Sequence, residues 1–185
     1  MNYSEYDCLA IGIPKSGTNA MEKAIRLYGK RPSLHTHTAN YHLAEKYKVG
    51  YIYRNPRNVL ISAQRYQNHQ VRGQADTLTE EKLITMAFGF FNAPIWAVYR
   101  GYEKWMTSQA CLIRYEDLVS GAENRKLAQY LGVEEKPIHL ELPGNTPTWT
   151  GKTSNWRDYW TEGLDKIWIE EGMLEIEESL GYCNV

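Results

Sequence analysis

Cysteine is scarce in this chain of 185 residues, which contains three. Cys8, Cys111 and Cys183 are far apart and form no Cys-x-x-Cys pair, so the sequence predicts neither a disulfide framework nor a zinc site. The chain also lacks an apolar run that approaches the ~20 residues of a membrane span. Its polar beginning lacks the basic and then apolar order of a signal peptide. We therefore expect a cytoplasmic protein with no membrane partner.

A surplus of basic charge is absent as well, because the formal net charge is −1. A nucleic-acid-binding protein usually carries a long basic stripe and a strongly positive balance, so no nucleic-acid partner is expected. The charge is nevertheless uneven. Residues 23–75 contain ten Lys or Arg and one acidic residue, whereas residues 76–185 contain ten Lys or Arg and eighteen acidic residues. A local excess of this kind can steer a small polyanion to a cleft.

The most specific pattern is a Pro-Lys-Ser-Gly-Thr turn at residues 14–18, which follows an apolar run and opens an expected helix. The beginning of a helix offers unpaired backbone N–H groups and the positive end of the helix dipole, and both favour an anion. A glycine lets the backbone approach the anion closely, and a lysine adds a full charge. The turn differs from the ATP-binding loop Gly-x-x-x-x-Gly-Lys-Ser/Thr, because its only lysine precedes its glycine. The residues expected to bind a phosphate-like group are Lys15, Ser16, Gly17, Thr18 and Asn19, of which Thr18 could also cap the helix.

Apolar runs alternate with helical patterns along the chain. Asn55 and Pro56 are expected to begin one helix, and Ser120 with Glu123 is expected to form a capping box for another. We expect strands at residues 7–12, 34–38, 49–53 and 110–114, and helices at residues 18–29, 56–66, 79–92, 94–107, 120–131 and 169–180. This order predicts a single α/β domain over residues 1–185, with a mainly parallel sheet whose ligand lies beyond the carboxyl ends of the strands.

Two of these segments together resemble the sulfotransferases that use 3′-phosphoadenosine 5′-phosphosulfate (PAPS). The 5′-phosphosulfate loop of that family has the form Pro-Lys-Ser-Gly-Thr, and residues 51–62, Tyr-Ile-Tyr-Arg-Asn-Pro-Arg-Asn-Val-Leu-Ile-Ser, are similar to its 3′-phosphate segment. Arg54 and Ser62 fall on the two phosphate-binding positions, while Arg57 is either a further ligand or a solvated surface residue. The resemblance implies a three-layer α/β sandwich of the P-loop-like sulfotransferase type. It also implies PAPS as donor, adenosine 3′,5′-bisphosphate (PAP) as product, no metal, and a hydroxyl or amine of a small molecule or glycan as acceptor.

His35 and His37 alternate with other residues, so in a strand both imidazoles would point to one face. The pair admits three interpretations: a metal pair, two structural histidines, or a site that contains a catalytic base. The resemblance favours the third, because cytosolic sulfotransferases have a Lys-Thr-His segment here with the histidine as general base. It therefore implies that His37 deprotonates the acceptor. Glu22 is the competing base, since some carbohydrate sulfotransferases use a glutamate on the helix that follows the loop.

Later segments resemble the family less closely. Tyr115, in Tyr-Glu-Asp-Leu, matches a family segment that lines the nucleotide site, and Lys152 is a candidate to close on the 3′-phosphate. The late family segment Arg-Lys-Gly-x-x-Gly-Asp-Trp is echoed only by residues 150–156, which end in Trp156. The tryptophan that follows the family's loop and stacks on adenine is absent. Trp149, Trp156 and Trp160 could form an aromatic wall for the acceptor or belong to the core.

Two other functions fit part of the pattern. An ATP-dependent small-molecule or nucleotide kinase is disfavoured by the missing Gly-Lys-Ser/Thr and by the lack of an obvious Mg²⁺-binding aspartate after an apolar strand. A nucleotide-binding protein with the same fold but without turnover is compatible with His35 and with the weak late segment.

Overall fold

The computed structural model describes residues 3–33, 35–70, 77–140 and 156–182. The chain divides into two compact units, each built from two stretches of sequence. The first unit comprises Met1–Arg54 and Gly101–Glu141, and the second comprises Asn55–Arg100 and Leu142–Val185.

A parallel sheet organises the first unit. Its strands are β1 (Leu9–Gly12), β2 (Val49–Tyr53) and β3 (Cys111–Arg114), in the order β1-β2-β3. In the register of the sheet Gly12 lies beside Ile52, and Tyr53 lies beside Arg114. Because all three strands run the same way, their carboxyl ends meet at one edge. The predicted α/β class and parallel sheet are confirmed.

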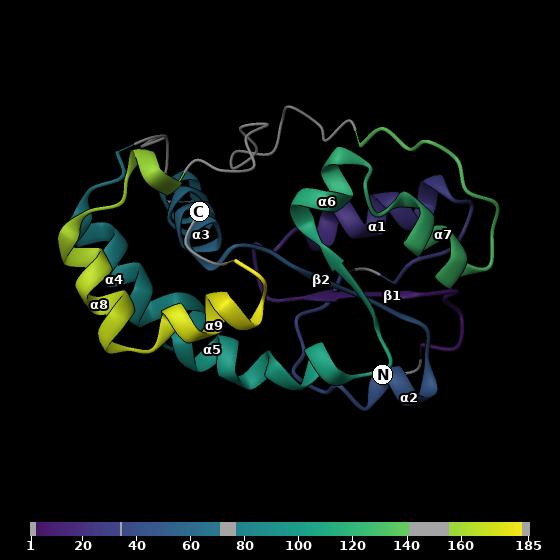
Figure 1. The fold of residues 1–185 in the computed structure, drawn as a ribbon, viewed down its shortest axis with the longest axis horizontal. Helices are drawn as coiled ribbons and strands as arrows, with labels where there is room; N and C mark the ends of the chain where they lie inside the picture. Colours follow the sequence, from purple (N-terminus) through teal and green to yellow (C-terminus); the bar gives the residue numbers. More distant parts are fainter. Residues whose placement is uncertain (1–2, 34, 71–76, 141–155, 183–185) are drawn as a thin grey trace. The chain divides into compact units, whose positions relative to one another are not determined.

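Helices cover both faces of this sheet (Figure 1). On one face lie α1 (Thr18–Leu27), α6 (Tyr115–Ser120) and α7 (Asn124–Leu131), and on the other lie the short α2 (Leu43–Lys46) and the 3₁₀ helix η2 (Glu103–Thr107). On the second face Trp105 is fully buried and stacks on Tyr51 at 5.3 Å between ring centroids. Strand residues therefore alternate between two buried faces, as expected for a sheet covered on both sides.

The second unit is helical. It contains α3 (Pro56–Gln70), α4 (Glu80–Gly89), α8 (Glu162–Glu170) and α9 (Met173–Ser179), with the 3₁₀ turns η1 (Phe90–Asn92) and η3 (Trp156–Asp158). It also contains α5 (Ile95–Tyr102) up to Arg100, and the end of that helix belongs to the first unit. The predicted start of α3 is confirmed, because Asn55 Oδ1 accepts hydrogen bonds from the N–H groups of Arg57 at 3.0 Å and Asn58 at 3.3 Å.

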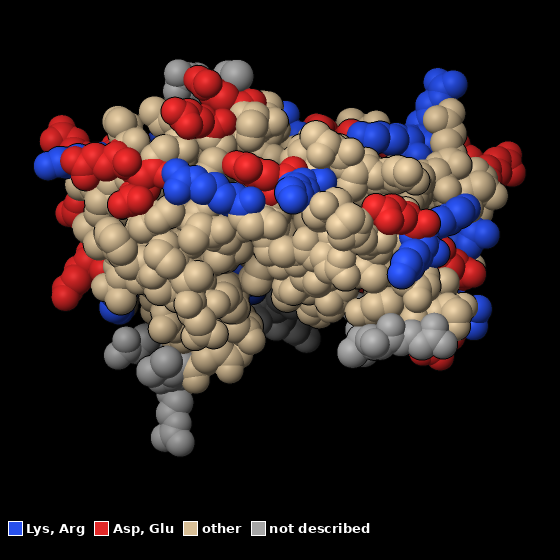
Figure 2. Space-filling view, turned by 90° about the horizontal axis from the view of Figure 1, so that it is seen from below, with Lys and Arg blue, Asp and Glu red and all other residues tan. Residues whose placement is uncertain are grey.

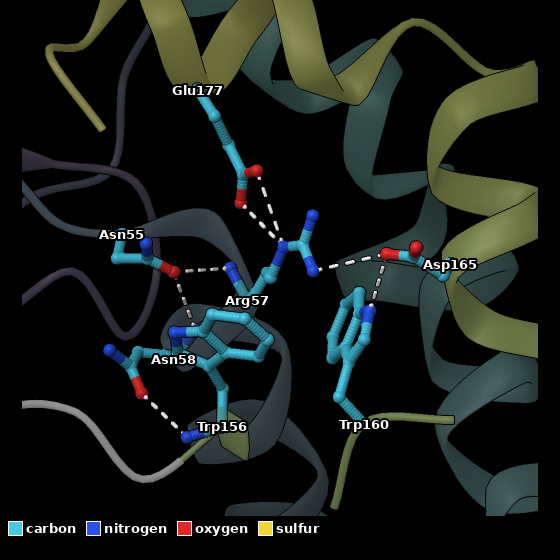
Figure 3. A network of polar contacts seen from close by, with 7 residues as sticks. All are labelled: Asn55, Arg57, Asn58, Trp156, Trp160, Asp165 and Glu177. Atoms are coloured by element: carbon cyan, nitrogen blue, oxygen red, sulfur yellow. Dashed lines mark hydrogen bonds and ion pairs between the residues drawn. The ribbon is translucent and has the colours of Figure 1, made fainter. Parts of the chain in front are cut away.

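Arg57 is the centre of a buried polar cluster in the second unit (Figure 3). Its Nε donates to both carboxylate oxygens of Glu177, at 3.1 and 3.2 Å, and its Nη1 lies 3.1 Å from Asp165 Oδ1. The rings of Trp156 and Trp160 lie against the guanidinium, 4.5 and 4.7 Å from its Cζ. Arg57 is therefore not a solvated surface residue, and its engagement by Glu177 and Asp165 disfavours the alternative that it is a phosphate ligand. The two tryptophans pack around it, which favours the core interpretation over an acceptor wall.

Three local predictions are wrong. Residues 34–38 form no strand over their described part; Thr36 makes only an isolated parallel bridge with Ile11. Ser120 and Glu123 form no capping box, because α6 already occupies residues up to Ser120 and α7 begins without a side-chain cap. The serine that matches a cap in sequence is instead the last residue of a short helix.

The third wrong prediction is the single C-terminal helix at residues 169–180, because the structure has two helices there. Gly172 has a φ of 71°, which separates α8 from α9, and Ile169 points outward with 55% of its surface exposed. The spacing of apolar residues continues through the break, so it does not reveal the change of direction. No helix in the described part of the chain is long and apolar enough to cross a membrane.

Replacing Arg57 with Ala should destabilise the protein strongly. Glu177 is 5% exposed, and burial raises its pKa while Arg57 opposes that rise, so its carboxylate would lose its principal partner. Breaking a buried pair of this kind costs about 3–5 kcal/mol of the free energy of unfolding. Urea denaturation measures this difference.

Arg157 offers a matched control, because it is exposed and its Cζ lies 4.4 Å from the same Trp156 ring. Arg157→Ala removes an arginine–aromatic contact without leaving a buried charge, and should cost at most about 1 kcal/mol. Equal losses for the two variants would show that the buried ion pair contributes nothing.

Candidate functional site

The predicted anion-binding loop connects β1 to α1 at the carboxyl edge of the sheet. Gly17 is the N-cap of α1, with a φ of 109°, and the amides of Ala20 and Met21 bond back to its carbonyl oxygen. The helix cap is therefore Gly17, and the alternative that Thr18 caps the helix is wrong. The amides that precede Ala20 in the first turn have no partner within their own helix, so they are suited to an anion.

Ser16 holds the loop to the sheet. Its hydroxyl donates to the carbonyl oxygen of Ile52 in β2 at 3.0 Å, and its N–H donates to the carbonyl oxygen of Ile13 at 3.0 Å. The residue is 1% exposed. The structure thus assigns Ser16 a part in fixing the loop, whereas its predicted contact with an anion stays a prediction.

Two glycines allow the loop to lie this close to its neighbours. A Cβ on Gly12 would come within 2.5 Å of Ser16 Oγ and 2.6 Å of the Ile52 carbonyl oxygen. A Cβ on Gly17 would overlap the ring of Tyr115, and the positive φ of Gly17 is itself unfavourable for other residues. The path of the loop therefore depends on the absence of side chains at both positions.

Lys15 and Arg54 bring two positive charges together at this edge. Lys15 has a φ of 70°, an uncommon conformation for a residue other than glycine. Burial and, to a smaller extent, the positive charge of Arg54 lower the pKa of Lys15 to about 8. Two cations held close together in a partly buried site favour binding of an anion.

Arg54 packs on Tyr115. Its Cζ lies 4.4 Å from the centroid of the Tyr115 ring, within the range of a cation–π contact. Tyr115 is 2% exposed, and burial raises the pKa of its hydroxyl to about 12, with Arg54 acting in the opposite direction. The phenol therefore remains neutral at physiological pH.

His37 lies beside the end of β1. Its Nδ1 is 2.7 Å from the carbonyl oxygen of Gly12, and because a carbonyl can only accept, Nδ1 carries the proton of the neutral ring. Nε2 is then the basic nitrogen. Burial lowers the pKa of His37, and the charges of His35 and Lys15 act in the same direction, while the bond to Gly12 opposes them. The imidazole is therefore neutral at pH 7 and can accept a proton.

Glu22, the competing base, has basic neighbours. Its Oε1 accepts from Arg26 Nη2 at 2.8 Å, and its Oε2 lies 3.6 Å from His35 Nδ1. The rings of His35 and His37 are 5.6 Å apart, so the two histidines are neighbours although the expected strand is absent. Both oxygens of Glu22 face cationic or protonatable groups, which favours His37 as the base.

Two other predicted ligands do not belong to the described part of the first unit. Ser62 is buried in α3, in the second unit, so its pairing with Arg54 on one phosphate stays a prediction. Lys152 lies outside the described residues. Trp156 donates its backbone N–H to Asn58 Oδ1 at 3.2 Å, a contact that no sequence pattern indicates.

Charged residues of both signs are interspersed on the face drawn in Figure 2. That face shows no continuous basic surface. Within the described ranges, no group of three or more His, Cys, Asp or Glu side chains is placed to hold a metal ion. The metal interpretation of His35 and His37 therefore gains no third ligand from these ranges.

Comparisons with known proteins agree with this architecture. Residues 30–142, more than half of the chain, match the sulfotransferase domain family, so the chain belongs to that family. The matched range contains Arg54, His37 and Tyr115 but begins after the Pro-Lys-Ser-Gly-Thr loop.

Among solved structures, the chain is similar to mouse sulfotransferase SULT7A1 complexed with PAP, with a TM-score of 0.68 and 17% sequence identity. The alignment covers 96% of this chain and 86% of the mouse chain, and it confirms the sulfotransferase fold. No curated protein matches the chain. Family membership supports sulfotransferase activity and disfavours the ATP-dependent kinase alternative.

Gly17→Ala should disturb the site through its overlap with Tyr115. Gly29 is the matched control, because it also has a positive φ, of 75°, but a Cβ added there would meet no atom within 4 Å. Gly29→Ala should lower the free energy of unfolding by about 1–2 kcal/mol, the cost of the backbone conformation. Gly17→Ala should lose about 1–3 kcal/mol more, because the ring must move. Equal losses of the free energy of unfolding, measured by urea denaturation, would mean that the Tyr115 ring moves aside without an energetic penalty.

Proposed function

We propose that the protein transfers the sulfuryl group of PAPS to a hydroxyl or amine acceptor and releases PAP. The observation that carries this proposal is the convergence of Lys15 and Arg54 beside the N-terminus of α1, at the carboxyl edge of a parallel sheet. Family membership supports the reaction class, and the PAP in the similar mouse structure supports the choice of donor.

The loop residues suit the phosphosulfate end of the donor. The amides of Gly17, Thr18 and Asn19 lie at the positive end of α1, and Lys15 lies next to them. PAPS, when bound, supplies a sulfuryl group that is activated by its anhydride link to the 5′-phosphate. Negative charge develops on that phosphate as the sulfuryl group leaves, and the proposed role of Lys15 is to stabilise it.

Arg54 is the proposed ligand of the 3′-phosphate. A guanidinium can bind a terminal phosphate through two parallel hydrogen bonds, which gives both strength and direction. Ser62 and Lys152 are proposed to contribute further contacts, and Tyr115 is proposed to line the nucleotide site. These assignments distinguish a 3′-phosphorylated nucleotide from its dephosphorylated form.

His37 is the proposed general base. With Nδ1–H donated to Gly12, Nε2 is available to accept the proton of the acceptor as the sulfur–oxygen or sulfur–nitrogen bond forms. The Gly12 carbonyl also stabilises the imidazolium that results. A small molecule or a glycan is the proposed acceptor.

Binding and turnover together test the proposal. Isothermal titration calorimetry should detect PAP binding and much weaker binding of ATP with Mg²⁺. Sulfuryl transfer from PAPS should then be found with at least one member of a panel of phenols, alcohols, amines and glycans. Tight PAP binding without any transfer would support the non-catalytic alternative, and preference for ATP with Mg²⁺ would overturn the proposed donor.

Arg54→Ala should weaken PAP binding by about 10–100-fold, because a charge-assisted bidentate contact is lost. It should also remove the preference for PAP over AMP, since AMP lacks the 3′-phosphate. Ser62→Ala should have the same effect to a smaller extent. An Arg54→Ala variant that still discriminates between the two ligands would contradict the assignment of the 3′-phosphate site.

Lys15→Ala should lower kcat by about 10²–10³-fold, the usual effect of removing one preorganised donor from a developing charge. PAP affinity should fall by a smaller factor than kcat, because the backbone amides at the start of α1 still bind the 5′-phosphate. Lys46, an exposed lysine of α2, provides the control, and Lys46→Ala should leave kcat unchanged. Wild-type kcat in Lys15→Ala would remove Lys15 from the mechanism.

The pH dependence of kcat/KM should be bell-shaped. Activity should rise with pH through a pKa below the ordinary histidine value of 6.5, because His37 must be neutral and its pKa is lowered. It should fall as pH rises through about 8, where Lys15 of the free enzyme loses its charge. The alkaline limb of kcat should lie at higher pH, because a bound phosphosulfate raises the pKa of Lys15.

Substitutions separate the two limbs. His37→Ala should lose activity and the acidic limb while retaining PAP binding, and Glu22→Gln should keep that limb. His42→Ala is the control, because His42 is exposed and pairs with Glu45 at 2.7 Å. An intact acidic limb in His37→Ala, with Glu22→Gln inactive, would identify Glu22 as the base.

A further inference from the structure

Tyr115 touches both anion-binding elements of the first unit. Because Tyr53 and Arg114 are paired in the sheet, the next residues, Arg54 and Tyr115, leave its carboxyl edge side by side. One face of the Tyr115 ring lies 4.4 Å from the Arg54 Cζ. Its Cδ2–Cε2 edge is the nearest neighbour of the position that a Cβ on Gly17 would take. A single ring thus lies between the loop backbone and the guanidinium.

The loop crosses the end of β2 to reach this ring. Ser16 bonds to the Ile52 carbonyl oxygen, and the Ile52 side chain lies 3.4 Å from the same Cβ position of Gly17. The loop therefore rests on β2 at one point and on Tyr115 at the next. Tyr115 is 2% exposed and begins α6, so neighbouring elements hold its ring in place. A phenol ring is rigid, so it fixes the distance between the loop backbone and the Arg54 guanidinium.

The contact between Arg54 and Tyr115 also affects the electrostatics of the site. Arg54 and Lys15 repel each other, and the charge of Arg54 lowers the pKa of Lys15. An aromatic face attracts the guanidinium through the ring quadrupole and leaves its net charge intact for an anion.

We infer that Tyr115 is a positioning residue that sets the separation of the phosphosulfate loop from Arg54, and so selects nucleotides that carry both a 5′- and a 3′-phosphate. This inference rests on the proposed function, because it takes the loop and Arg54 as the two phosphate sites. A nucleotide with only a 5′-phosphate uses one of these elements and gains nothing from their spacing. The effect of Tyr115 is therefore on the preference for PAP over AMP.

Calorimetric titration with PAP and AMP tests the inference. Tyr115→Leu removes the aromatic face at similar bulk and should weaken PAP binding by about tenfold, with AMP affected less than about twofold. Tyr115→Phe keeps the ring and should restore the wild-type preference. In an Arg54→Ala background, Tyr115→Leu should cause no further loss of PAP binding, because the two residues act as one unit.

Tyr28 provides a matched control. It is a buried tyrosine of the same unit at the other end of α1, and its hydroxyl lies 3.0 Å from the Asn124 carbonyl oxygen. Tyr28→Leu should lower stability without changing the ratio of PAP to AMP affinity. Should Tyr28→Leu change that ratio as much as Tyr115→Leu does, the effect is one of general stability and the inference is overturned.

Ring fluorination keeps the test decisive if Tyr115→Leu fails to fold. Phenylalanine analogues with increasing fluorine content at position 115 weaken the cation–π contact while nearly preserving ring shape. PAP affinity should decline stepwise along this series, and a constant affinity overturns the inference. If the wild type itself does not prefer PAP to AMP, the proposed 3′-phosphate site has failed. A wild-type preference that survives in Tyr115→Leu overturns only the role of Tyr115.

Discussion

The close approach of three chain segments at Gly12 is the constraint on which the candidate site depends. Its missing side chain admits both the Ser16 hydroxyl and the Ile52 carbonyl oxygen, and its own carbonyl oxygen accepts from His37. The loop proposed to face the anion and the residue proposed to face the acceptor are thus fixed by the end of one strand. Neither requires a long side-chain network to be positioned.

The site also keeps like charges together in the protein without ligand. Burial and the neighbouring Arg54 both disfavour the charged form of Lys15. An anion bound between the two cations would relieve this repulsion, so the arrangement favours an anionic ligand. Positive neighbours act in the same direction as burial on His37: they lower its pKa, so the imidazole stays neutral and is able to accept a proton.

Much of the architecture could be predicted from short-range patterns. The three strands are compact apolar runs, and Asn55 with Pro56 is a local helix-start signal that acts through hydrogen bonds within three residues. The meeting of the loop, Arg54 and Tyr115 at one edge followed from the parallel order of strands, whereas the strand expected to carry His37 is absent from the described residues. Such features depend on neighbours in sequence or on a general property of parallel sheets.

What could not be predicted depends on distant partners or on single backbone angles. Arg57 has the sequence context of a solvated helix residue, and only the tertiary structure supplies Glu177 and Trp156 as its neighbours. Gly172 interrupts an apolar spacing that reads as continuous, because periodicity does not record a left-handed residue. The contact of Gly17 with Tyr115 joins residues from different strand ends and leaves no trace in local composition.

The ion pair between Arg57 and Glu177 has a consequence for the order of folding. The two residues are 120 positions apart in sequence, and the pair is part of a unit assembled from two separate stretches of the chain. During synthesis from the N-terminus, α3 emerges long before its carboxylate partner, so the guanidinium must stay hydrated until α9 arrives. Contacts of such long sequence separation form slowly, because the intervening chain must be closed into a loop first. The helical unit is therefore completed late, and a ribosome-bound chain that already contains the whole loop between β1 and α1 still carries α3 without its buried counter-ion.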